Sequence, residues 1–151
     1  MSNRFPPEVI MDLTRKQVDR AAVALAGLRA RERAAMETLT MLETCRQDYR
    51  SRLDQKGRSG IDHTDWINYQ AFLHKLDHAI AQQSGVISQC RLQTQAGLEQ
   101  WQASRIRLKS FEVLLQRHER EDRLRDSRIE QRNQDEKGAQ VYLRKLTENE
   151  S

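Results

Sequence analysis

The fold is decided by residues 11–53, which read MDLTRKQVDRAAVALAGLRARERAAMETLTMLETCRQDYRSRL. Positions taken at alternating steps of three and four residues from Met11 to Leu53 are mostly apolar. The exceptions are Thr14, Glu32 and Arg46. The full series is Met11, Thr14, Val18, Ala21, Leu25, Leu28, Glu32, Ala35, Leu39, Leu42, Arg46, Tyr49 and Leu53. A 3.5-residue repeat kept for this long predicts a helix that supercoils with a partner helix.

A second series of the same kind follows further along the chain. It comprises Trp66, Tyr69, Leu73, Leu76, Ile80, Gln83, Ile87, Cys90, Thr94, Gly97, Trp101, Ser104, Leu108, Phe111 and Leu115. Each series forms one seam, meaning the row of side chains that a coiled-coil helix turns toward its partner. Because the two seams are close in sequence, we expect the two helices to be partners of each other.

The segment between the seams has the composition of a turn. Residues 55–60 read QKGRSG and contain two glycines without apolar periodicity. Pro6 and Pro7 favour a helix start just after them, and Asp62 and Thr64 are candidate N-caps for a second helix. The prediction is an all-α fold, a long two-helix antiparallel coiled-coil hairpin with the shape of a rod. It forms a single domain over 1–151, with helices over about 8–55 and 63–140, a turn over about 56–62, and a charged C-terminal extension from about 116.

A turn centred in this segment also predicts the register of the hairpin, with facing residues whose numbers sum to about 119. Leu42 then lies near Leu76, and the weak seam positions Thr94 and Gly97 face the alanines of residues 21–24, which allows close approach of the helices. The same register separates Cys45 from Cys90 by about 24 Å along the axis, too far for a disulfide.

Composition excludes several other classes of protein. With 37% hydrophobic and 5% aromatic residues the chain has too little apolar material for a large globular core, and its mean hydropathy of −0.87 accompanies 32% charged residues. No stretch has the length of a membrane span or the pattern of a signal peptide, so we expect a cytoplasmic protein without membrane insertion. The net charge of +4 is concentrated in residues 1–60, but arginines there alternate with acidic residues. Binding to nucleic acid therefore stays open only as an alternative.

Candidate catalytic and metal sites are weak. His74 and His78 are one helical turn apart beside Asp77, but no third distant ligand is evident. The segment 57–60, which reads GRSG, lacks the lysine and the length of a phosphate-binding loop. A two-helix rod also offers no closed cleft for catalysis. We expect no catalytic residue, no metal, no cofactor and no small-molecule substrate, and hence no enzyme.

Residues 119–137 are unusually rich in charge. Glu119 with Arg123 and Glu121 with Arg125 have the i,i+4 spacing that supports an exposed helix. Two interpretations are open for this segment. It is either a solvated tail or a charged segment that becomes ordered inside a partner.

Three local stretches resemble the central signature of the flagellar FliJ family: YRSRL at 49–53, WINYQAFL at 66–73 and LDHAIAQQ at 76–83. Trp101 followed by Arg105, Arg107, Leu108 and Lys109 is also similar to that family, as are the pairs at 130–131 and 135–136. Arg132 and Asn133 depart from the family pattern. The resemblance covers nearly the whole chain and is strongest from about 46 to 83.

The resemblance implies a soluble stalk component of the bacterial flagellar type III protein export apparatus, similar to the central stalk of rotary ATPases. It implies three partners: the hexameric flagellar export ATPase, the cytoplasmic domain of the export gate protein, and flagellar export chaperones. The open end of the hairpin, residues 8–28 with 108–137, would enter the ATPase ring. The protein would be a monomer when alone, and in the cell it would associate peripherally with the inner membrane at the flagellar base. A coiled-coil chaperone or adaptor outside the flagellum is the alternative.

Three apolar residues lie just beside the seams near the turn: Cys45, Phe72 and Ala79. With neighbouring seam residues they would form an exposed patch of the kind that marks a partner site. The family resemblance implies that the export gate binds at the same positions, and the full predicted set is Leu42, Cys45, Tyr49, Phe72, Leu76, Ala79 and Gln83. The alternative is that Phe72 only folds over the seam and shields Leu73 and Leu76.

Overall fold

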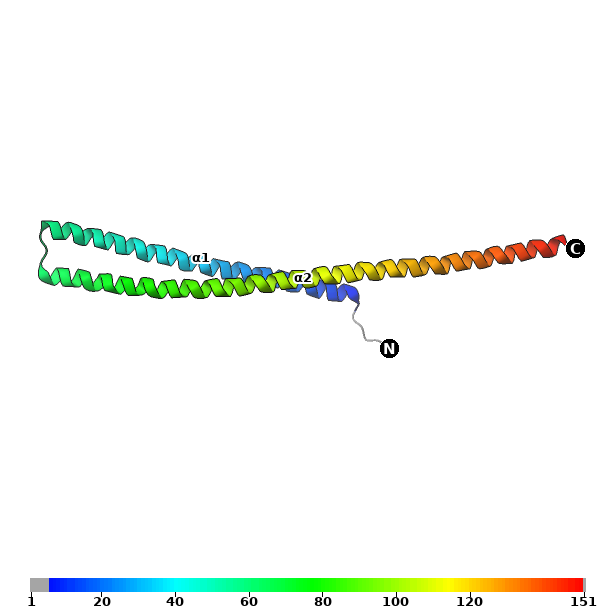
Figure 1. Cartoon of the computed structure of the whole chain (residues 1–151), viewed down its shortest axis with the longest axis horizontal. Helices are drawn as coiled ribbons and strands as arrows, with labels where there is room; N and C mark the ends of the chain where they lie inside the picture. Colours follow the sequence, from blue (N-terminus) through cyan, green and yellow to red (C-terminus); the bar gives the residue numbers. More distant parts are fainter. Residues whose placement is uncertain (1–5, 151) are drawn as a thin grey trace. The chain divides into compact units, whose positions relative to one another are not determined.

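A computed structural model describes residues 6–150, and all but a few of these are helical. Helix α1 spans Pro7–Ser59 and helix α2 spans His63–Asn149, and no strand occurs among the described residues (Figure 1). The predicted all-α antiparallel hairpin is confirmed. Neither described helix contains an apolar stretch long enough to cross a bilayer.

Both ends of α1 have identifiable stop signals. The Pro6 carbonyl accepts hydrogen bonds from the backbone N–H of Val9 at 3.0 Å and of Ile10 at 3.4 Å, which places the first helical residue at Pro7. At the other end Gly60 has φ of 93°, the left-handed conformation that commonly ends a helix and that glycine adopts without strain. Gly57 remains helical, so α1 extends further than the predicted end near residue 55.

The connection is therefore only Gly60–Asp62, shorter than the segment expected from sequence. Asp62 is the N-cap residue of α2, because its carbonyl accepts a hydrogen bond from the Trp66 backbone N–H at 3.0 Å. Thr64, the other candidate cap, lies inside the helix. The hairpin is thus centred near residue 61.

The structure divides into two compact units. One unit is Arg15–Arg105, which contains the turn and most of both seams, and the other holds the described residues of Met1–Thr14 with those of Ile106–Ser151. Within the first unit α1 and α2 lie side by side and antiparallel (Figure 1). In the second unit Met11 and Thr14 of α1 are buried, and Leu108, Phe111 and Leu115 of α2 are half-buried.

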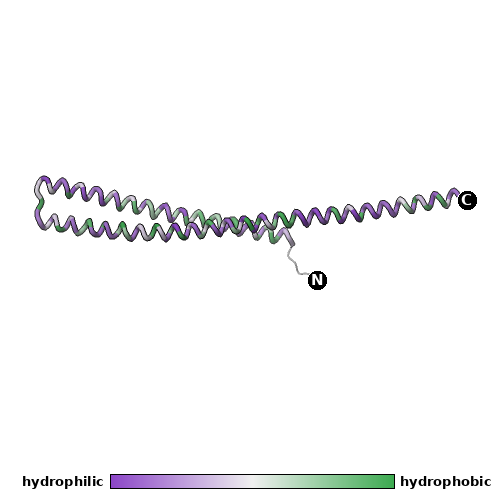
Figure 2. Tube along the Cα trace, in the orientation of Figure 1, coloured by the Kyte–Doolittle hydropathy of each residue, from purple (hydrophilic) through white to green (hydrophobic). Residues whose placement is uncertain are grey.

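The two seams are the places where side chains lose solvent contact. In α1 every position of the predicted series is buried or half-buried, and every other described residue of the helix is exposed. In α2 every position of the predicted series is also buried or half-buried except Trp66, which is 44% exposed. Five residues of α2 outside the series are half-buried as well: Gln70, Ala79, Leu98, Glu112 and Asp122. Trp66 lies in the first turn of α2, where no preceding turn of its own helix covers it. Figure 2 shows polar and apolar residues alternating along both helices, as seams of this kind require.

Polar side chains at seam positions are hydrogen-bonded or ion-paired. Thr14 donates to the Ile10 carbonyl at 2.8 Å, and Ser104 donates to the Trp101 carbonyl at 2.8 Å. Between the helices Gln83 Nε2 donates to the Ala35 carbonyl at 2.9 Å. These bonds remove the cost of burying polar groups between two apolar rows. Interruptions of the seam in the sequence are therefore compatible with a continuous helix pair.

The register differs from the predicted one by about three residues. The residue numbers sum to 123 for Arg46 with Asp77 and for Glu32 with Arg91. They sum to 122 for Leu28 with Thr94, rather than the predicted 119. The shift follows from the turn, because a hairpin centred at residue 61 pairs residues whose numbers sum to 122. Cys45 thus lies opposite residues near Asp77 instead of residue 74, and both cysteines are free thiols.

The close approach of the helices occurs at Gly97, as expected, but against different residues. Gly97 faces Leu28 and Leu25 instead of the alanines at 21–24. A β-carbon placed at Gly97 would be 2.6 Å from Leu28 Cδ1, so glycine here makes room for a leucine of the other helix. Leu28 thus fills the space that a side chain at residue 97 would occupy, which is the close packing typical of protein interiors.

Candidate partner-binding surface

An aromatic cluster crosses from α1 to α2 near the turn. The Tyr49 ring lies between two rings of α2, with centroids 4.8 Å from Tyr69 and 4.4 Å from Phe72, and both pairs are tilted by 43°. Tilted pairs at this distance are the favourable arrangement for aromatic rings. We call Tyr49, Tyr69 and Phe72 the aromatic cluster. It fixes the position of Phe72 relative to α1.

A lysine completes this cluster on its turn side. Lys56 Nζ lies 5.0 Å from the Tyr69 ring centroid, within cation–π range. A side-chain hydrogen bond to Tyr69, together with the charge of that phenol, raises the pKa of Lys56 above its ordinary value. Since Lys56 is fully exposed, the interaction orients the side chain and adds little to stability.

Phe72 is part of the cluster and also part of the surface. Its side chain is 38% exposed even though one face of the ring meets Tyr49. The ring contacts the seam residue Tyr49 and still presents apolar area to solvent. An aromatic ring held in one position and half in water is a good anchor for a partner protein.

On α1 the surface continues as a shallow hollow beside Tyr49. Thr40, Met41, Thr44, Cys45, Asp48, Tyr49 and Arg52 line it. Met41 is 72% exposed and Cys45 is exposed, so the rim offers apolar groups to solvent. Tyr49 lines this hollow and also contacts Phe72, so it joins the hollow to the aromatic cluster. Met41 was missed from sequence, although it immediately precedes the seam residue Leu42, because the seam pattern does not select it.

The other predicted residues differ in their access to solvent. Leu76 is buried, and Leu42, Ala79 and Gln83 are half-buried. The Gln83 amide is hydrogen-bonded to the Ala35 carbonyl and so supports the helix pair as well. Leu76 and Gln83 therefore hold the surface in place, whereas Cys45, Phe72 and Met41 are open to a partner. We call Met41, Cys45, Tyr49 and Phe72 the turn-side patch.

The histidines considered for metal binding lie on the same stretch of α2. Asp77, which separates them, forms an ion pair with Arg46 of α1. Among residues 6–150 no group of three or more His, Cys, Asp or Glu side chains is placed to hold a metal ion. The carboxylate of Asp77 has a role in joining the two helices.

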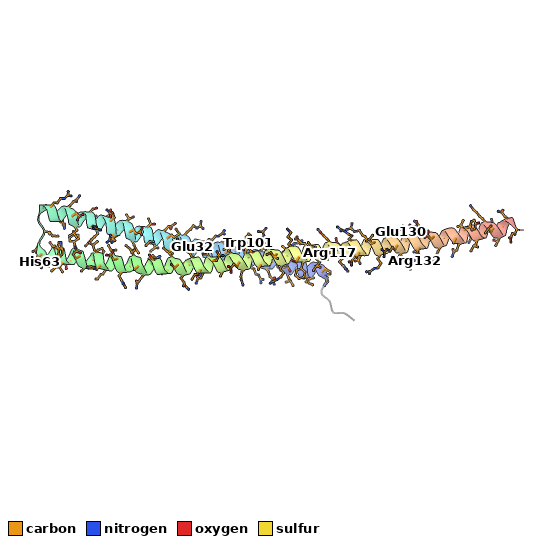
Figure 3. The ribbon with its side chains drawn as sticks, viewed as in Figure 1. Glu32, His63, Trp101, Arg117, Glu130 and Arg132 are labelled. Carbon is orange, nitrogen blue, oxygen red and sulfur yellow. The ribbon has the colours of Figure 1, made fainter. Side chains whose placement is uncertain are left out.

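The last part of α2 differs from the rest. From residue 116 to the end of the helix every described residue is exposed except Asp122, which is half-buried. His118 Nε2 lies 3.4 Å from an Asp122 carboxylate oxygen, and Arg125 lies 4.0 Å from the other oxygen, so polar contacts between neighbouring turns follow the helix surface. Figure 3 marks Arg117, Glu130 and Arg132 along this segment. We call residues 116–149 the α2 tail.

Comparison with known proteins gives consistent matches. The family model described as "Flagellar FliJ protein" matches residues 5–147. A flagellar FliJ protein of Salmonella typhi is 33% identical over 138 residues, which is 91% of this chain and 94% of that protein. The flagellar FliJ protein of Escherichia coli K12 is 31% identical over 136 residues, 90% of this chain and 92% of that protein.

One solved structure also matches over most of its length. It is described as a putative YscO homolog, CT670, from Chlamydia trachomatis. The TM-score is 0.49 at 18% sequence identity, and the alignment covers 93% of this chain and 96% of that one.

Proposed function

Because this chain belongs to the flagellar FliJ family, and thus to the flagellar type III export components, we propose that it is the stalk of its export apparatus. In this proposal it links the hexameric export ATPase to the cytoplasmic domain of the membrane export gate. It also assists export chaperones, and through them flagellum assembly. Its place in the cell is the cytoplasmic face of the inner membrane at the flagellar base, where it is held peripherally by these partners.

The observation that carries the proposal is the turn-side patch. Phe72 is fixed against Tyr49 at 4.4 Å and remains partly exposed, and Tyr49 also lines the hollow that contains the exposed Cys45 and Met41. An apolar patch of this kind on a highly charged coiled coil favours a protein partner. We assign the export gate to this patch, together with the supporting residues Leu42, Leu76, Ala79 and Gln83.

The ATPase is assigned to the α2 tail and the adjoining paired segment around Met11 and Leu108. A helix that no other described part of the chain covers, with alternating charges, is thin enough to enter a ring. Exposed ion pairs such as Arg125 with Asp122 exchange partners at a cost of roughly 0–1 kcal/mol, so contacts with the ring need not lock the tail in one orientation.

The mechanism that fits such a molecule is mechanical. Paired helices transmit displacement along their axes, because the backbone hydrogen bonds and the seam resist compression and slippage. ATP hydrolysis would take place in the ring and opening would take place at the gate, with this chain between them. We propose that the chain itself performs no catalysis and needs no cofactor.

The two alternatives from sequence are less well supported. Family membership favours the flagellar export apparatus over an unrelated chaperone or adaptor. For nucleic acid, a continuous basic surface would be needed, whereas acidic residues such as Asp77 and Glu32 pair with arginines between the helices.

The test is a motility experiment combined with partner capture. A bacterial strain that lacks its own FliJ protein receives this chain with an affinity tag, together with the cognate ATPase and gate. We expect restored swimming and recovery of both partners with the tagged chain. Full swimming without recovery of either partner, even after chemical crosslinking, would contradict the linking role.

A further inference from the structure

A second hollow, lined by residues of both α1 and α2, lies well away from the turn. Its lining residues are Ala22, Leu25, Ala26, Arg29, Glu32, Arg33, Met36, Thr94 and Trp101. None of them belongs to the turn-side patch, and all lie within Arg15–Arg105. Figure 3 marks Glu32 on α1 and Trp101 on α2 along this stretch. We call it the arginine-rimmed groove.

The floor of the groove is apolar and is formed partly by small side chains. Ala22 and Ala26 follow each other at i,i+4 on α1, and their small side chains leave a hollow above the seam residue Leu25, which is itself buried. Trp101 contributes part of an indole ring from α2, and Met36, 44% exposed, closes the far end. From Ala22 to Met36 the floor is about 21 Å long, which is roughly four helical turns.

The rim of the groove is positively charged. Arg29 and Arg33 line it directly on α1. From α2, Arg105 lies 4.7 Å from the Trp101 ring centroid, and Arg91 lies 3.6 Å from a carboxylate oxygen of Glu32. Glu32 is the acidic residue in the lining and Arg91 pairs with it, so an excess of guanidinium charge borders the apolar floor.

From this combination we propose that the arginine-rimmed groove binds an amphipathic helix of another protein, whose apolar stripe is flanked by aspartate or glutamate. In helix bundles a third helix packs into the long, shallow groove between two helices that lie side by side. Apolar side chains of the incoming helix would cover Ala22, Ala26 and Trp101. Its carboxylates would pair with Arg29 and Arg33, and Arg is well suited to such pairing because its planar fork can bind a carboxylate with two hydrogen bonds.

The shape of the site separates this partner from other anionic partners. A phosphate backbone needs cationic groups without an apolar floor, and a bilayer surface needs a broad apolar face instead of a narrow groove. The tryptophan and methionine between arginines match the composition of protein interfaces, where Trp, Met and Arg are enriched.

The experiment uses the full chain with Trp66→Phe, which leaves Trp101 as the fluorescent reporter. The probe is a synthetic helical peptide of about 18 residues with leucines at i, i+3, i+4 and i+7 and glutamates on both flanks. Titration should change the Trp101 emission and reach saturation. A peptide with the same leucines and lysine flanks should bind at least about tenfold more weakly, because like charges then face each other.

Matched variants locate the site. Arg29→Glu with Arg33→Glu should weaken binding of the acidic peptide by about tenfold or more. The control is Arg20→Glu with Arg31→Glu, which makes the same change of charge at exposed positions of α1 outside the groove. The control should bind the peptide within about twofold of the parent, since exposed charges at a distance are screened by salt.

Three results would overturn the proposal. The first is the absence of any Trp101 change with the acidic peptide when circular dichroism confirms that the chain is folded. The second is an equal loss of binding in the groove variant and in the control. The third is binding of duplex DNA or anionic lipid vesicles, but not of the peptide, that depends on Arg29 and Arg33.

Discussion

Gly97 of α2 and Leu28 of α1 are so close that a β-carbon at residue 97 would lie 2.6 Å from Leu28 Cδ1. Contact at this distance requires the leucine to move, and Leu25 limits its freedom because Leu25 Cδ1 is 3.7 Å from the same point. The close approach of the two helices therefore depends on the missing side chain.

This relationship gives a prediction with a built-in control. Gly85→Ala, in open space on the same helix, should raise the free energy of unfolding by about 0.5–1 kcal/mol, because alanine favours the helix. Gly97→Ala should lose that gain and be less stable than Gly85→Ala by about 1–3 kcal/mol, because the added carbon overpacks the interface. Urea denaturation of the two variants measures the difference. Equal stabilisation by both would show that the helices are not in close contact at residue 97.

The ion pair between Arg46 and Asp77 should contribute little to stability. The side chains are 33% and 48% exposed, so water screens the attraction between them. A double-mutant cycle with Arg46→Gln and Asp77→Asn should give a coupling energy of about 0.2–1 kcal/mol, and the coupling should shrink in 1 M salt. A coupling of several kcal/mol that is unaffected by salt would mean that the pair is buried.

Most of the fold could be predicted from the sequence, because a seam is a local pattern. Each residue from Met11 to Leu53 that the 3.5-residue repeat selects is buried or half-buried, including the polar Glu32 and Arg46. The pattern depends only on helical geometry and on the burial of apolar groups. It needs no knowledge of the partner helix.

The register and the details of the surface could not be predicted. The register depends on where the turn lies. The sequence does not distinguish Gly57, which stays helical, from Gly60, which adopts the positive φ that ends the helix. No sequence pattern specifies the distance between two rings, so neither the contact of Tyr49 with Phe72 nor the exposed Met41 near Tyr49 can be predicted from it. Such contacts join residues that are far apart along the chain.

Removal of the α2 tail should separate two functions. A chain that ends at Leu115 should keep the helix pair folded, since the described tail residues are exposed apart from Asp122. The same truncation should abolish stimulation of the hexameric export ATPase and leave binding to the gate domain intact. Measurements of ATPase rate and of gate-domain capture check both parts. Full stimulation by the shortened chain would rule out the tail as the contact with the ring.

The central claim is that the export gate binds the turn-side patch, and Phe72→Ala tests it most directly. The variant should lose about 1 kcal/mol of unfolding free energy, because the substitution removes a partly exposed ring and its contact with Tyr49. Thermal melting measures this loss. The matched control is Ile67→Ala, which removes a 48% exposed apolar side chain from the same end of α2 outside the patch.

The deciding measurement is the equilibrium binding of each purified variant to the cytoplasmic domain of the gate protein. Phe72→Ala should weaken binding by about tenfold or more, the effect expected for an anchoring aromatic residue, whereas Ile67→Ala should bind as the parent does. Binding of a folded Phe72→Ala protein at parental affinity would contradict the assignment of the gate to this surface.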